Sequence, residues 1–260
     1  MILSHSHRFI FMHSRKTAGS SVTAVLNRHL GPDDLQLGSW PESIANGGRY
    51  NRRALRVALR SPAKLLGKSA QHSLKQRALG LSPGAVNGIT KAHWKRRGLP
   101  LTVHSRAADV AGLCPDAWGA YFKFAVVRNP WAHAVSDYHW RSHVRGRPQV
   151  SFREYLLRLE DRGRPDPEKV RPPIVSNWEI YAIDDAVAVD FVGRYETLAE
   201  DLREAGRRIG IPIDISGVRA KAGLRKGAPS IAEHYDDELI EIVRRAYGKE
   251  IAAFGYAPPF

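Results

Sequence analysis

The fold of this chain is indicated by the stretch Ser14-Arg15-Lys16-Thr17-Ala18-Gly19-Ser20-Ser21-Val22, which directly follows the apolar run Phe9-Ile10-Phe11-Met12. A short strand, a turn of small and hydroxyl-bearing residues and a helix together form a cradle for phosphate, because backbone N–H groups and a helix N-terminus point at the anion. Lys16 adds a positive charge, and Thr17, Ser20 and Ser21 add hydroxyl donors. The turn is a poor match to the ATP- and GTP-binding loop, since its glycine follows the lysine instead of preceding it.

A second anion-binding signature lies about a hundred residues further on, in Phe124-Ala125-Val126-Val127-Arg128-Asn129-Pro130, and is followed by Ser136. The Arg128 guanidinium offers a two-pronged donor to phosphate, and a strand–turn–helix of this length can bring the Ser136 hydroxyl to the same anion. Two such segments predict a nucleotide that carries phosphate at two separate places.

Together these segments, S-R-K-T-A-G-S-S-V and F-A-V-V-R-N-P-W-A-H-A-V-S-D-Y, resemble the 5′-phosphosulfate and 3′-phosphate motifs of sulfotransferases that use 3′-phosphoadenosine 5′-phosphosulfate (PAPS). The nearest group is the carbohydrate sulfotransferases, which include the heparan sulfate 2-O-sulfotransferases and small bacterial relatives. Further similar segments are V-H-S-R-A at 103–107, D-F-V-G-R-Y-E-T-L at 190–198 and I-A-A-F-G-Y at 251–256. The resemblance covers residues 8–30 and roughly 100–256, and it leaves 40–98 unexplained.

The resemblance implies an α/β fold of the P-loop-containing sulfotransferase type, with a central parallel sheet flanked by helices in a single domain over residues 1–260. Residues 40–98 would form a basic helical or loop insertion within it. PAPS would be the co-substrate, no metal would be needed, and the acceptor would be a hydroxyl of a carbohydrate or glycolipid. The PAPS-binding residues that it implies are Arg15, Lys16, Thr17, Ala18, Gly19, Ser20, Ser21, Arg128, Ser136, Arg225 and Lys226.

The resemblance also implies the catalytic residues, Lys16 and His104. Lys16 would hold the 5′-phosphate and then stabilise the negative charge on the bridging oxygen of the departing nucleotide. His104 aligns with a histidine that precedes the 3′-phosphate segment, and an imidazole suits a general base because its pKa lies near working pH. His93 and then Glu42 are the alternative bases.

Other residues near these motifs have a structural interpretation beside the functional one. Arg194 and Glu196 are expected to form a structural pair. Trp131, Tyr138 and Trp140 could line an acceptor cleft, although aromatic residues on one helix face are more often core.

Composition bounds the class of protein. The chain has 260 residues, of which 43% are hydrophobic, and this is enough for one sizeable α/β domain. Its single cysteine, Cys114, excludes an intramolecular disulfide. No apolar run approaches the ~20 residues that span a bilayer, and no signal-peptide pattern opens the chain. A cytoplasmic enzyme, with membrane association left open, is therefore expected.

The positive charge is concentrated in one segment. From Ser43 to Ala108 the sequence has no Asp or Glu but 14 Lys and Arg, which equals the net charge of +14 of the whole chain. This segment could hold an anionic polysaccharide or glycolipid acceptor, lie on an anionic membrane surface through residues 49–97, or form a solvated face. No recognised nucleic-acid motif is present, so no nucleic-acid partner is expected.

Strands alternating with helices favour a parallel sheet with crossover helices, whose ligands lie at the carboxyl ends of the strands. We expect strands at 8–13, 101–103, 121–127 and 188–192, helices at 19–30, 107–113, 131–144, 152–160, 177–183, 198–209 and 236–254, one or two basic amphipathic helices within 52–77, and loops at 31–50, 80–100 and 219–228.

Two other functions remain open. A P-loop kinase using ATP is disfavoured by the missing glycine and by the lack of a clear acidic Mg²⁺ ligand after a strand, Asp190 being the one candidate. A non-catalytic polyanion-binding protein on the same fold is permitted by the net charge and would show binding that weakens steeply with salt, without turnover.

Overall fold

The computed structural model describes residues 1–76, 80–97, 101–143, 150–218 and 230–260. The contacts of the chain divide it into two compact units. Unit 1 comprises Met1–Val126 and Glu179–Ala220, and unit 2 comprises Val127–Trp178 and Lys221–Phe260. A single domain over residues 1–260 stays a prediction, since it concerns whether the two units fold together.

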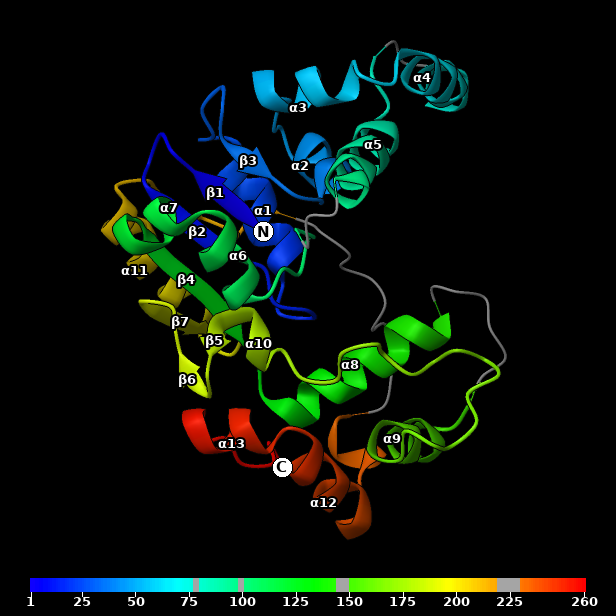
Figure 1. The fold of residues 1–260 in the computed structure, drawn as a ribbon. Coiled ribbons are helices and arrows are strands. Elements are labelled where there is room, and N and C mark those ends of the chain that lie inside the picture. Colours follow the sequence, from blue (N-terminus) through cyan, green and yellow to red (C-terminus); the bar gives the residue numbers. More distant parts are fainter. Residues whose placement is uncertain (77–79, 98–100, 144–149, 219–229) are drawn as a thin grey trace. The chain divides into compact units, whose positions relative to one another are not determined.

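Unit 1 is built on a sheet and contains most of the helices of the described chain (Figure 1). Its strands are β1 (Ile2–Ser4), β2 (Phe9–Met12), β3 (Leu35–Gln36), β4 (Phe122–Val127), β5 (Ala182–Ile183), β6 (Ala186–Val187) and β7 (Phe191–Arg194). Its helices are α1 (Gly19–Asn27), α2 (Trp40–Ala45), α3 (Arg52–Ala58), α4 (Pro62–Gln76), α5 (Pro83–Arg96), α6 (Ala107–Leu113), α7 (Pro115–Ala120), α10 (Trp178–Tyr181, which begins at the unit boundary) and α11 (Leu198–Ile209).

The five-stranded sheet has the strand order β3-β1-β2-β4-β7. β2 and β4 pair in parallel at its centre, with Phe9 opposite Phe122 and Met12 opposite Ala125. β1 is antiparallel to both β2 and β3. The predicted α/β class with a parallel centre is therefore confirmed, and an antiparallel edge makes the sheet mixed. β1 and β3 were missing from the expected strands because runs of three and two residues show no readable alternation.

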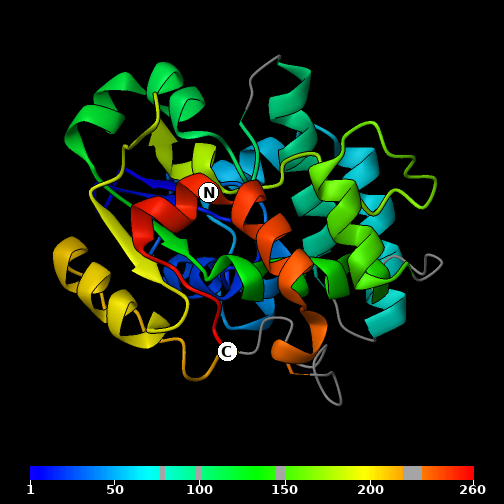
Figure 2. The same cartoon turned by 90° about the horizontal axis from the view of Figure 1, so that it is seen from below.

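Helices cover both faces of this sheet. Seen from below, the sheet lies between α6 and α7 on one side and α1 and α11 on the other (Figure 2). Alternate residues of the central strands, among them Phe9, Phe11, Phe124 and Val126, are buried in one apolar cluster with side chains of α1 and α11. Burial of large apolar side chains stabilises such a layer by roughly 1.5–3 kcal/mol each, which fixes the start of α1 against the end of β2.

The segment between β1 and β3 is organised by the buried carboxylate of Asp34. Its Oδ2 accepts from the Ser4 hydroxyl (2.6 Å) and the Gly31 amide (2.9 Å), and its Oδ1 accepts from the amides of His5 (2.7 Å) and Ser6 (3.1 Å). Burial alone would raise the pKa of Asp34, but the hydrogen bonds outweigh it, so the pKa is lowered.

We expect Asp34→Asn to lower the free energy of unfolding by about 1–3 kcal/mol. The side-chain NH2 group of asparagine is a donor, and it would face N–H or O–H donors from which the carboxylate oxygen now accepts. Since the folded pKa lies below the unfolded one, the carboxylate contributes stability that is present near neutral pH and lost as pH falls through the acid range. Urea unfolding at neutral and acid pH measures both effects. The matched control is Asp33→Asn, whose carboxylate is half exposed and paired with Arg52, and whose replacement should have a clearly smaller effect because an exposed ion pair is screened by solvent. Equal effects of the two substitutions would contradict this role of Asp34.

Unit 2 is helical in its described part, with α8 (Pro130–His143), α9 (Phe152–Glu160), the 3₁₀ turn η1 (Ala232–His234), α12 (Asp237–Ala246) and α13 (Gly248–Phe254). Apolar side chains of α8, α9 and α12 form its core, together with Val170 and Tyr247. A polar group lies inside this core: Asp137 accepts from Arg141 (2.6 Å) and from the Tyr155 hydroxyl (3.0 Å).

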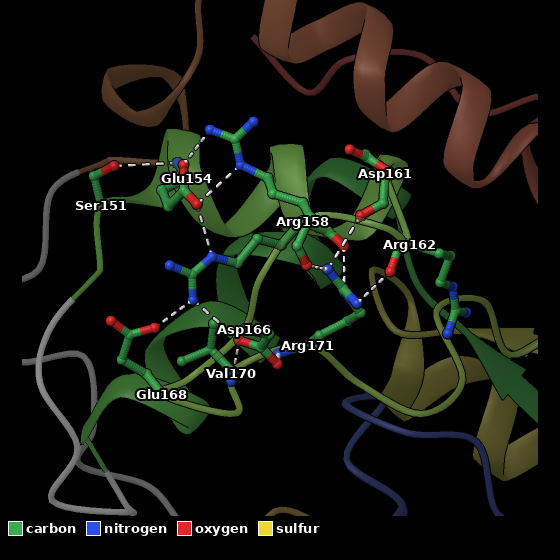
Figure 3. Close-up of polar contacts among 10 residues, drawn as sticks. Ser151, Glu154, Arg158, Asp161, Arg162, Asp166, Glu168, Val170 and Arg171 are labelled. Atoms are coloured by element: carbon green, nitrogen blue, oxygen red, sulfur yellow. Dashed lines mark hydrogen bonds and ion pairs between the residues drawn. The ribbon is translucent and has the colours of Figure 1, made fainter.

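A network of ion pairs and hydrogen bonds fixes the proline-rich chain that follows α9 (Figure 3). Arg158 donates to Glu154 (2.7 Å), Asp166 (3.0 Å) and Glu168 (2.6 Å). The Arg171 guanidinium donates to four carbonyl oxygens, those of residues 158, 161, 162 and 164. The polar residues of this segment are therefore densely hydrogen-bonded. Arg171 donates to carbonyl oxygens at and after the end of α9, and Arg158 pairs with the carboxylates.

Several expected elements are wrong in type or extent. Residues 83–96 form α5 and not a loop, because Ser82 caps the helix by accepting from the Ala85 amide (3.2 Å) and Pro83 stands in its first turn. Residues 101–103 are not a strand, since the Ser105 hydroxyl bonds both the amide and the carbonyl of Thr102 and closes a turn. The last helix breaks at Tyr247 into α12 and α13.

The remaining differences are smaller. The predicted loop at 31–50 contains β3 and α2, and α7 was not expected. The strand expected at 188–192 is β7, three residues later at its start, while the other predicted helices are confirmed within a few residues. The loop expected at 219–228 lies outside the described residues.

Candidate active site

The loop between β2 and α1 has a backbone geometry that suits an anion. Lys16 and Ala18 both have positive φ values, 61° and 60°, a left-handed conformation that side chains other than glycine rarely adopt. Alternation of left- and right-handed residues turns successive N–H groups toward one side of the chain, which is the geometry of a backbone anion nest. Strain of this kind costs on the order of 1–3 kcal/mol per residue and is characteristic of ligand-binding loops.

The N-terminus of α1 completes this loop. Ala18 stands at the cap position, where no side chain hydrogen-bonds the first turn and no acidic residue occurs in that turn. The Thr17 hydroxyl is turned inward and donates to the Ser14 carbonyl (3.2 Å), so Thr17 stabilises the loop from within. Lys16, Ser20 and Arg15 are half-buried, whereas Ser21 is buried at 9% exposure. The helix dipole and an uncapped end favour a negative charge at this position.

Gly19 lets α1 begin directly against the ring of His13. A Cβ atom on Gly19 would lie 2.1 Å from Cδ2 and 2.2 Å from Nε2 of that ring. The ring cannot move aside easily, because it stacks on Phe11 (5.7 Å between centroids) and meets His104 edge-on (5.0 Å). Gly19 is therefore needed for close packing and not for a left-handed turn.

We expect Gly19→Ala to lower the free energy of unfolding by about 1–3 kcal/mol, as overpacking of a closed site does. The control is Gly112→Ala in α6, where nothing lies within 4 Å of the added atom, so that the substitution should be neutral or stabilising. Chemical unfolding of the three proteins measures the difference. A Gly19→Ala protein as stable as wild type would show that the His13 ring yields at no cost.

His104 is joined to the start of this loop by a hydrogen bond. Its Nδ1 lies 2.7 Å from the carbonyl oxygen of His13, across 91 residues of sequence. A carbonyl oxygen can only accept, so Nδ1 carries the hydrogen and Nε2 is the basic nitrogen. The His104 amide also donates to the Thr102 hydroxyl (3.2 Å), which fixes the backbone beneath the ring. The arrangement holds a neutral histidine in the tautomer that a general base requires.

Burial is the largest cause that lowers the pKa of His104 from its ordinary value to about 4. The bond to the His13 carbonyl opposes this, while the positive charges of the N-terminus, Arg15 and Lys91 lower the pKa further. Two consequences follow. The imidazole is uncharged near neutral pH, and Arg15 of the loop and Lys91 of α5 lie near enough to act on it.

The two alternative bases lie in different surroundings. Glu42 is in the first turn of α2, whose cap residue Ser39 reaches the loop through a contact between the hydroxyls of Ser39 and Ser20 (3.4 Å). His93 is buried in α5, and its pKa is lowered by burial and by Arg97, Arg60 and Arg96. Of the two, Glu42 lies in the helix whose cap residue contacts the loop.

In unit 2, the residues after β4 begin α8. Asn129 caps the helix, since its Oδ1 accepts from the Trp131 (3.1 Å) and Ala132 (3.4 Å) amides, and its Nδ2 donates to the Ala257 carbonyl (2.7 Å). Arg128 is buried at 9% exposure, and Ser136 is half-buried two turns along the helix. Asn129 was not among the predicted site residues, although Asn-Pro before a helix is a recognisable cap signal.

The aromatic residues of α8 belong mainly to the core of unit 2. Trp131 is 1% exposed, and Tyr138 packs on Phe152 and donates to the Val150 carbonyl (2.9 Å). Trp140 is half-buried beside the Arg141 guanidinium.

Of two further predicted features, one lies among the described residues and the other does not. Near β7, Asp201 accepts from the Arg194 amide and the Thr197 hydroxyl (both 2.7 Å), and a pair between Arg194 and Glu196 stays a prediction. Arg225 and Lys226 lie outside the described residues.

No helix of the described residues is long and apolar enough to cross a membrane. Within the same residues, no three His, Cys, Asp or Glu side chains are grouped as metal ligands would be.

The mixed sheet and the loop after β2 define a protein of the α/β class, with a turn whose backbone geometry suits an anion. A model of the sulfotransferase family matches residues 1–257, so the chain belongs to the sulfotransferase family. An uncharacterized protein of Archaeoglobus fulgidus is 30% identical over 105 residues, which cover 36% of this chain and 72% of that protein. The crystal structure of a sulfotransferase from Alicyclobacillus acidocaldarius is 20% identical with a TM-score of 0.32, and the match covers 58% of this chain and 60% of that one.

Proposed function

We propose that this protein transfers the sulfuryl group of PAPS to a hydroxyl of a carbohydrate or glycolipid. Family membership supports a sulfotransferase. The observation that carries the mechanism is the 2.7 Å bond between His104 Nδ1 and the His13 carbonyl, because it attaches a neutral base to the loop that holds Lys16.

The loop from Ser14 to Ser21 would bind the 5′ end of the donor. The left-handed residues Lys16 and Ala18 and the uncapped start of α1 supply N–H groups and a dipole for the anion. The Lys16 ammonium would hold the 5′-phosphate and stabilise the charge that develops on its bridging oxygen. Arg15, Ser20 and Ser21 would add donors, while Thr17 would act through its bond inside the loop and Gly19 through its packing on His13.

PAPS, when bound, supplies an activated sulfuryl group. His104 Nε2 takes the proton of the acceptor hydroxyl as the hydroxyl oxygen forms a bond to sulfur, and the bond from sulfur to the phosphate oxygen breaks to release adenosine 3′,5′-bisphosphate (PAP). An anion at the loop would offset the positive charge of Arg15, which now lowers the pKa of His104, and would move that pKa toward the working range. Donor binding would therefore strengthen the base.

The resemblance of the Arg128-to-Ser136 segment suggests that it binds the 3′-phosphate, and Arg225 and Lys226, which lie outside the described residues, would contribute to the same site. The Asn129 cap and its bond to the Ala257 carbonyl would hold Arg128 in place. Asn129 is therefore a positioning residue in this proposal.

The kinase alternative is disfavoured by the surroundings of Asp190. Its Oδ2 accepts from the Lys123 amide (2.7 Å) and pairs with the Lys123 ammonium (2.9 Å), so its charge is engaged where a Mg²⁺ ligand would have to be open. The Asp190 carboxylate therefore links the chain just before β7 to Lys123 of β4.

The direct test is transfer of ³⁵S from labelled PAPS to a panel of polysaccharides and lipid extracts, with EDTA present, followed by separation of labelled products. We expect a labelled carbohydrate or glycolipid, formed about 10²–10⁴-fold more slowly with His104→Asn. Transfer of ³²P from ATP with Mg²⁺, and no ³⁵S transfer, would replace this proposal with the kinase.

A further inference from the structure

Helix α4 presents three different faces along its length. Leu65 (2% exposed) and Ser69 (8% exposed) are turned into unit 1. A second row, Ala63, Leu66, Ala70 and Leu74, recurs at spacings of three or four residues, so it forms one stripe of the helix. This second apolar stripe is in solvent, since Leu66 is 66% and Leu74 is 81% exposed.

Positive charge borders the exposed stripe. Lys64 and Lys68 are exposed and lie one turn apart on the flank of the stripe that is not buried. Leu59, 63% exposed, and the exposed Arg60 come just before α4, at the end of α3. No acidic residue occurs anywhere from Ser43 to Ala108; from outside the segment, Asp33 pairs with Arg52 and Arg56 of α3, and Asp109 pairs with Arg106.

We propose that the exposed stripe of α4, with Leu59 and the adjoining cations, docks on the surface of an anionic lipid bilayer. An apolar stripe beside a row of lysines fits the interface of such a bilayer, where leucines enter the acyl boundary and ammonium groups meet lipid phosphates. A soluble polysaccharide would satisfy the charges but not the leucines. A second copy of the chain would bring the same excess of positive charge against this face, which disfavours self-association.

The docking helices are attached to the candidate active site within unit 1. Helix α4 packs on α5, α5 packs on α2, and α2 packs on α1 at the loop (Figure 1). Lys91 of α5 already acts on the pKa of His104. Docking would therefore attach unit 1, which also carries the proposed base, to the membrane surface. The inference itself does not depend on the proposed activity.

The test is sedimentation of the full chain with vesicles of phosphatidylcholine, with and without phosphatidylglycerol, at low and high salt. Wild type should bind only the vesicles with phosphatidylglycerol. Leu66→Gln with Leu74→Gln should lower the partition coefficient by about tenfold or more, because buried apolar area sets interfacial binding. Lys64→Gln with Lys68→Gln should lower it by about tenfold at low salt and less at high salt.

Controls separate insertion from general stickiness. Leu113→Gln with Val187→Gln alters two exposed apolar residues elsewhere in unit 1 and should leave binding unchanged. In a Cys114→Ser background, an environment-sensitive dye on Leu66→Cys should shift to the blue with anionic vesicles.

Three results would overturn the inference. One is equal binding to both kinds of vesicle. Another is binding to anionic vesicles and to soluble dextran sulfate alike that the leucine substitutions do not change, which would indicate a polyanion partner. The third is a dimer in light scattering that the leucine substitutions dissociate, which would indicate a second copy. None of these readouts uses sulfuryl transfer, so a failure here is distinguishable from a failure of the proposed function.

Discussion

Replacement of Lys16 with alanine is expected to lower the rate of sulfuryl transfer by about 10²–10³-fold, the effect of removing one preorganised group that stabilises developing charge. Lys16 stands in a left-handed conformation at the centre of the loop, two residues before the cap position of α1. The measurement is the steady-state release of PAP from PAPS with the acceptor that the labelled-donor screen identifies.

The matched control is Lys249→Ala, which removes an exposed lysine of α13 in unit 2 and should leave the rate unchanged. The unfolding midpoints of both variants should stay close to wild type, since Lys16 is half-buried and contributes no core packing. A Lys16→Ala enzyme that retains wild-type kcat and loses only affinity would contradict a role for Lys16 in charge stabilisation during transfer.

Replacement of His104 with asparagine is expected to lower kcat by about 10²–10⁴-fold, the range for loss of a general base. Asparagine was chosen because its side-chain amide can still donate to the His13 carbonyl, so the bond that holds the loop can persist while the basic nitrogen is lost. Binding of PAP should change little. Glu42→Gln and His93→Gln test the alternative bases, and a loss of the same size at Glu42 with none at His104 would transfer the role to Glu42.

The pH dependence follows from the lowered pKa of His104. Below its pKa of about 4 the imidazole is protonated and cannot accept the acceptor's proton, so kcat/KM for PAPS should fall as pH drops toward 4 and stay level through neutral pH. The acid limb of kcat should lie at higher pH, because donor binding offsets the charge of Arg15 in the complex.

Stability gives a second readout of the same group. Since the folded pKa is below the unfolded value of 6.5, His104 contributes stability that is present above pH 6.5 and lost between pH 6.5 and 4. His104→Asn should therefore flatten the fall of unfolding free energy in this range. An unchanged slope would show that His104 titrates normally.

The fold was predictable where periodicity was strong. The run 9–12 is continuously apolar, the segment 122–127 is apolar except for Lys123, and α11 repeats its apolar residues at helical spacing, so all three were expected close to their observed bounds. α5 was missed because Pro83, Gly84 and Gly88 were interpreted as loop, although Ser82-Pro83 is a helix start. β1 and β3 were missed because they are only three and two residues long, and the Asp34 hydrogen bonds that organise the segment between them leave no local sequence pattern.

In the candidate site too, some features could be predicted from the sequence and others could not. Lys16 and its neighbours were recognisable because the chemistry of the loop is local in sequence, and the resemblance pointed to His104. The carbonyl of His13, the closeness of its ring to Gly19 and the hydroxyl contact of Ser39 arise from packing between segments up to 91 residues apart. Backbone atoms carry no sequence signal, so the group that fixes the tautomer of His104 could be found only in the structure.

The most direct test of the account is calorimetric titration of PAP, ATP and AMP into the full chain, with EDTA or with Mg²⁺, for wild type, Lys16→Ala and Arg128→Ala. We expect metal-independent binding of PAP that is tighter than binding of ATP or AMP. Each variant should lose about 10–100-fold in affinity, as removal of a charged hydrogen-bonding group does, with circular dichroism unchanged. Tighter binding of ATP with Mg²⁺, or no nucleotide binding at all, would contradict it.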